Sequence, residues 1–136
     1  MSKTLIYRTA AGLALVGVLA HELIGAPMVL DPLDASTLPK NIVWLHHFSW
    51  HVGSVSVIAI VGMYWYASSH SGQHALAIAA TTISGGFAIL GIGLAIFGDA
   101  IVWTTPAPYV WTLVAGVGAF GVARDMSHGQ SPSDAH

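Results

Sequence analysis

The chain has 136 residues, of which 54% are hydrophobic and only 7% are charged, and its formal net charge is −2. Soluble domains carry about 25% charged residues, so this composition excludes a soluble globular domain and predicts an integral membrane protein whose apolar surface contacts the lipid bilayer. The small negative charge offers no basic surface for nucleic acid, and the lack of cysteine excludes disulfides and thiolate metal sites.

The first predicted element is a membrane-spanning helix over about residues 5–25. A hydrocarbon layer about 30 Å thick requires roughly 20 helical residues, and this segment is long enough. Lys3 and Arg8 precede the apolar run at residues 10–20 and imitate the start of a signal peptide, but this run extends on both sides, which favours a retained span. Near its end the segment carries His21 and Glu22.

A polar, proline-containing loop of about fifteen residues is expected after Gly25, and a second span follows over about residues 41–67. Its first turns contain the stretch WLHHFSWHVG, with His46, His47 and His51. His47 and His51 are four positions apart and therefore share one side of a helix. Ionisable side chains at this depth usually face protein or a functional cavity, so we expect these histidines to face the interior of the bundle.

The third span is predicted over about residues 74–97, with Asp99 just beyond its end, and the fourth over about residues 106–123. On the fourth span, the packing face is predicted from small residues, which are Thr112, Ala115, Ala119 and Ala123. The polar tail at 127–136 is expected to be disordered. The predicted fold is all-α, with one domain over residues 1–126 formed by a bundle of four transmembrane helices.

Basic residues indicate how this bundle lies in the membrane. With four spans, Lys3, Arg8 and Arg124 fall on one side and only Lys40 on the other. Because cytoplasmic loops are enriched in Lys and Arg, both termini are predicted to be cytoplasmic (N-in/C-in), and the host membrane to be a bacterial inner membrane. The polar residues of the first three spans then gather in the outer, periplasmic half.

This outer group of polar residues predicts a metal site. Imidazole and carboxylate ligands without thiolate suit zinc, iron or copper(II), and histidines at i and i+4 let one helix supply two ligands. Such a site would serve metal handling or metal-assisted redox or hydrolytic chemistry; the Glu-x-x-His pairs of di-iron bundles are absent. The expected ligands are His21, His47 and His51, with Glu22, His46 and Asp99 as further ligands or as hydrogen-bond partners of the ligands.

Two alternatives to a metal ion stay open at this point. A haem b could lie between His21 and either His47 or His51, although only Lys40 is available for its two propionates on that side. The chain could also be a metal-free accessory subunit of a larger membrane complex, or a homo-oligomer. In that case the histidines would handle protons or adjust an interface at mildly acid pH.

Overall fold

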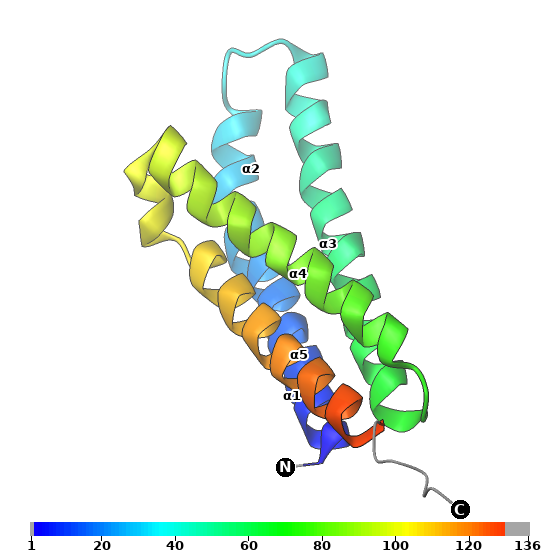
Figure 1. The fold of residues 1–136 in the computed structure, drawn as a ribbon. Coiled ribbons are helices and arrows are strands. Elements are labelled where there is room, and N and C mark those ends of the chain that lie inside the picture. Colours follow the sequence, from blue (N-terminus) through cyan, green and yellow to red (C-terminus); the bar gives the residue numbers. More distant parts are fainter. Residues whose placement is uncertain (1, 130–136) are drawn as a thin grey trace, which may run out of the picture.

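The computed structural model describes residues 2–129, and every regular element among them is helical (Figure 1). The all-α prediction is confirmed. Residues 130–136 of the predicted tail lie outside the described residues. The elements are α1 (Lys3–Ala20), the π turn η1 (His21–Gly25), α2 (Ala26–Asp34), α3 (Lys40–Ser69), α4 (His74–Gly93), the π turn η2 (Leu94–Gly98), the 3₁₀ helix η3 (Ala100–Thr104) and α5 (Ala107–Gly129).

Three helical stretches are long and apolar enough to cross a membrane, namely Lys3–Asp34, Lys40–Ser69 and His74–Gly98. They contain the first three predicted spans and are compatible with a membrane location. At the fourth predicted span the structure has α5, a helix of 23 residues. It is not among the three stretches that meet the length and hydropathy required for a span.

Two predicted boundaries are wrong. The first helical stretch continues past Gly25 to Asp34, because η1 and α2 follow α1 without a break. The connection to α3 is therefore much shorter than the predicted loop. At the other end of the chain, α5 continues to Gly129, so the first residues of the predicted tail are helical.

The helices pack as two antiparallel pairs, α1 with α3 and α4 with α5, which contact each other through α1–α5 and α3–α4 (Figure 1). The buried core lies toward the end that holds the N-terminus and consists mainly of alanine, valine and two stacked tyrosines, Tyr7 and Tyr64. The buried positions described on α5 are Pro108, Val114, Gly118 and Gly121, whereas the predicted face of small residues is half-buried or exposed. That prediction is wrong.

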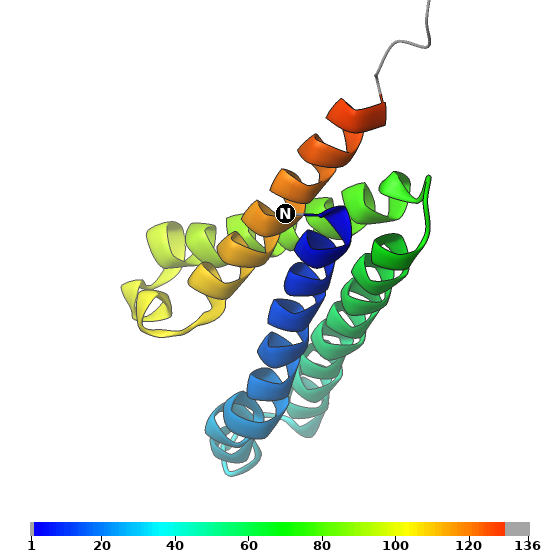
Figure 2. The same ribbon diagram turned by 90° about the horizontal axis from the view of Figure 1, so that it is seen from below.

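Toward the other end of the molecule the two helix pairs diverge (Figures 1 and 2). In Figure 1, α2 and the beginning of α3 extend above the remaining helices, and in both views η2 and η3 lie apart from them. The hairpin formed by η1, α2 and the first half of α3 thus stands largely by itself. Most of the polar residues predicted to form a site lie on this hairpin.

Candidate functional site in the α1–α3 hairpin

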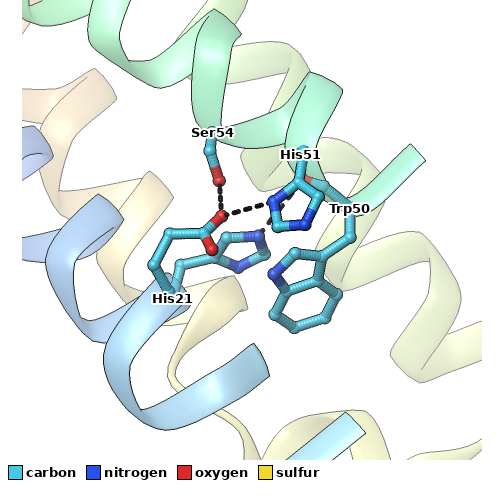
Figure 3. A network of polar contacts seen from close by, with 5 residues as sticks. His21, Trp50, His51 and Ser54 are labelled. Atoms are coloured by element: carbon cyan, nitrogen blue, oxygen red, sulfur yellow. Dashed lines mark hydrogen bonds and ion pairs between the residues drawn. The ribbon is translucent and has the colours of Figure 1, made fainter. Parts of the chain in front are cut away.

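A π turn places two of the predicted site residues. Pro27 has no N–H to donate to the carbonyl four residues earlier, which interrupts the α-helical hydrogen bonds. The Ala26 N–H instead bonds to the His21 carbonyl, five residues earlier. Such π turns are often found at functional sites. Here the turn contains His21 and Glu22, and both side chains contact α3 (Figure 3).

The centre of the site is the Glu22 carboxylate. Glu22 Oε1 accepts a hydrogen bond from Ser54 Oγ and lies 3.2 Å from His51 Nδ1, which donates to it (Figure 3). The Ser54 hydroxyl is buried, whereas the side chains of Glu22 and His51 are 32% and 56% exposed. One carboxylate oxygen therefore joins two positions of α3 that lie three residues apart.

His21 contacts the same turn of α3. Its ring stacks on the Trp50 indole, with ring centroids 3.9 Å apart and planes inclined by 9°, and its Nε2 lies 3.4 Å from the Trp50 carbonyl oxygen. Gly25 and Gly53 allow η1 and α3 to approach closely enough for the His21 ring to stack on Trp50. A Cβ on Gly25 would lie 3.1 Å from the Trp50 ring, and one on Gly53 would lie 4.0 Å from His21 Nε2. The buried indole N–H of Trp50 has no hydrogen-bond partner among the described residues.

A second histidine–carboxylate pair lies nearer the tip of the hairpin. His47 Nε2 donates to Asp34 Oδ1 at 2.7 Å, and the His47 ring is 6.5 Å from the His51 ring, centroid to centroid. The Asp34 side chain is 56% exposed. His47 lies one turn before His51 on α3. The His47–Asp34 pair therefore lies one turn nearer the tip of the hairpin than the His51–Glu22 pair.

The structure thus brings together three of the six predicted ligands, His21, Glu22 and His51, where η1 meets α3. The other three lie elsewhere. His47 pairs with Asp34, and His46 Nδ1 donates to the Ile42 carbonyl of its own helix at 2.9 Å. Asp99 caps η3, where its Oδ1 accepts from the Ile101 N–H, on the helix pair that diverges from the hairpin.

These contacts pair each histidine with one partner instead of gathering several around a common point. Among the side chains that the structure describes, those of residues 2–127, no three or more His, Asp or Glu are grouped so that they could hold a metal ion. The Trp50 ring occupies the space beside Gly25. The arrangement is instead that of an acid–base pair, in which a carboxylate and an imidazole share hydrogen-bonded protons.

Three residues that contact the predicted ligands are not themselves among those ligands, namely Ser54, Asp34 and Trp50. The spacing along α3 puts Ser54 on the same face of the helix as His47 and His51. It does not predict the hydrogen bond between Ser54 and Glu22. Asp34 was expected in a solvated turn, because the prolines suggested that the helix ends earlier. Trp50 belongs to the stretch WLHHFSWHVG, but nothing in the sequence predicts that its indole stacks on His21.

Comparisons of the chain with models of protein families, with curated proteins and with solved structures find no match.

Proposed function

We propose that the chain is an integral membrane protein with four spans, N-in/C-in in a bacterial inner membrane, with the hairpin site toward the periplasm. The three long apolar helices support the first three spans. Lys3 Nζ lies 3.5 Å from Asp125 Oδ1, so α1 begins beside the end of α5, as an even number of spans requires. The same end of the bundle holds Arg8 and Arg124, which favours the cytoplasmic side for it.

We infer that the hairpin site takes up and releases protons in an accessory subunit of a larger membrane complex. The observation that carries this inference is the hydrogen bonding of Glu22 to both His51 and Ser54. Histidine changes charge between about pH 5 and 8. When an imidazole is hydrogen-bonded to a carboxylate, the two groups titrate as a coupled pair. Ionisable groups in membrane segments are costly and mark functional sites.

Proton exchange at this site would be confined to one side of the membrane. Between Ser54 and the tyrosines of the core, the facing residues are apolar and buried, including Val18, Val57 and Ile60. The buried Ser84 hydroxyl donates to the Ala80 carbonyl of its own helix at 2.8 Å. The role that fits is a local change of charge, at an interface where a partner subunit or a second copy covers the half-exposed His51 ring.

Difference infrared spectroscopy between pH 8 and pH 5 tests this function, because it detects protonation of individual carboxyl and imidazole groups. For Glu22→Gln we expect the carboxylate stretching band that shifts when His51 changes charge to disappear and the His51 imidazole change to alter with it, since the two groups share a hydrogen bond. The matched control is His46→Gln, whose ring bonds only to its own helix and which should leave the Glu22 signal intact. A Glu22→Gln spectrum that lacks one carboxyl band and is otherwise unchanged would contradict the shared site.

A metal ion at the same place is a second candidate, favoured by the position of His21. Its ring lies against the turn of α3 that carries His51, and it is next in sequence to Glu22, so three potential ligands lie where η1 meets α3. Elemental analysis of untagged protein purified without chelators should then find about one zinc, iron or copper ion per chain. The ion should be lost in His51→Ala and kept in His46→Ala. Protein that stays free of metal after reconstitution with all three ions would eliminate this candidate.

A further inference from the structure

A groove on another side of the molecule has no part in the hairpin site. It runs along α5 from Pro108 to Phe120 and is completed by Ile6 and Thr9 of α1, with Ile92 and Trp103 at its far end. Nearly all of its lining is apolar. The two threonine hydroxyls in it are already used, since Thr9 donates to Leu5 O at 2.9 Å and Thr112 to Pro108 O at 2.6 Å. The groove therefore suits an occupant without hydrogen-bonding groups along its length.

The dimensions of the groove suit one hydrocarbon chain. From Pro108 to Phe120 the helix rises about 18 Å at 1.5 Å per residue, close to the roughly 15 Å of one leaflet in a hydrocarbon core about 30 Å thick. Gly116 lies between these two residues, and a Cβ built on it meets no heavy atom within 4 Å. The groove is thus open at its middle.

A cationic side chain lies at the Phe120 end of the groove. The Arg124 guanidinium lies over the Phe120 ring, 5.8 Å from its centroid, one helical turn beyond the groove. The neighbouring Asp125 is paired with Lys3, which offsets its negative charge. An arginine beside a phosphate forms charge-assisted hydrogen bonds through its planar fork of donors, and anionic lipids are attracted to basic residues at the cytoplasmic surface.

We propose that this groove binds one acyl chain of an anionic phospholipid from the leaflet at the N-terminal end, with the lipid phosphate at Arg124. The proposal rests on the four-span placement proposed above, because α5 must lie in the bilayer. A second copy is a poorer occupant: a two-fold axis along the membrane normal would bring the Arg124 residues of both copies to the same end, where their charges repel.

The test compares two glycines that both have open space around a built Cβ. Gly116 lines the groove and Gly62 of α3 does not, so Gly116→Leu fills the groove and Gly62→Leu is its matched control. Delipidated protein is titrated with phosphatidylglycerol or phosphatidylcholine, and bound lipid is measured by native mass spectrometry. We expect wild type and Gly62→Leu to bind phosphatidylglycerol about tenfold more tightly than phosphatidylcholine.

Gly116→Leu should lose both lipids, whereas Arg124→Gln should keep the chain and lose the preference for the anionic headgroup. The proposal is overturned if Gly116→Leu binds like Gly62→Leu, if Arg124→Gln keeps the full preference, or if Gly116→Leu converts a dimer to monomers. A separate labelling experiment tests whether α5 lies in the membrane. The chain has no native cysteine, so a single Leu113→Cys variant labelled by a membrane-impermeant maleimide in proteoliposomes would place α5 in water.

Discussion

Replacing Gly118 by alanine should destabilise the protein by about 1–3 kcal/mol, the usual cost of adding a methyl group to a filled core. A Cβ at this position would lie 2.6 Å from Thr81 Oγ1 and even closer to Tyr64 Oη. Neither hydroxyl can yield easily. Thr81 donates to the Ala77 carbonyl at 2.7 Å, and Tyr64, which is fully buried, lies 2.9 Å from Thr81 Oγ1. Unfolding of the purified protein in detergent measures the loss.

The control is Gly116→Ala, two residues earlier on the same helix, where a Cβ meets nothing within 4 Å. Alanine is preferred to glycine in helices by about 1 kcal/mol, so this variant should be neutral or slightly more stable. Adding Tyr64→Phe to Gly118→Ala removes the nearest atom and should recover part of the loss. Equal effects at Gly116 and Gly118 would show that α5 does not cross α3 and α4 at Gly118.

This crossing also explains why the packing face of α5 was predicted wrongly. Glycine and alanine occur on both sides of α5. Their small size therefore does not show which side of the helix packs against its neighbours. The difference lies in the neighbours: Gly118 and Gly121 meet Tyr64 and Tyr7, two large side chains far away in sequence. Sequence spacing contains no information about which partner a small residue faces.

The helical hairpin and its polar centre were more predictable. An antiparallel pair of helices with a short connection brings the end of one beside the start of the next, and His21, Glu22 and His51 meet for that reason. The partner of His47 was not predictable, because it depends on α2. Pro27 suggested a helix end, but the π turn accommodates it and carries the helix on to Asp34.

The predicted role of Asp99 depended on a compact bundle. Its place at the end of the third span is as expected, but the helix pairs diverge, and Asp99 becomes the cap of η3. Divergence follows from where the small residues lie. The buried alanines of α1 and α4 are concentrated toward the end with the N-terminus, so the close contacts hold the bundle there and leave the hairpin to be held by its own polar contacts.

Those polar contacts lead to a second large effect, at Glu22. Glu22→Ala should destabilise the protein by about 1–3 kcal/mol, because it leaves the Ser54 hydroxyl buried without its acceptor. Ser54 is only 8% exposed, so water cannot readily replace the carboxylate. The matched control is Asp31→Ala in α2. The Asp31 carboxylate is exposed, so its removal should change stability by less than about 0.5 kcal/mol.

A double-mutant cycle separates the bond itself from general damage to the hairpin. Ser54→Ala alone removes one donor from Glu22, and Glu22→Ala/Ser54→Ala removes both partners, so no buried group is left unpaired. The double variant should therefore be more stable than the sum of the single losses predicts, with a coupling of roughly 1 kcal/mol or more, measured by unfolding in detergent. Additive losses would mean that the two side chains do not depend on each other. A coupled result would show that the hydrogen bond between Ser54 and the Glu22 carboxylate helps to hold η1 against α3.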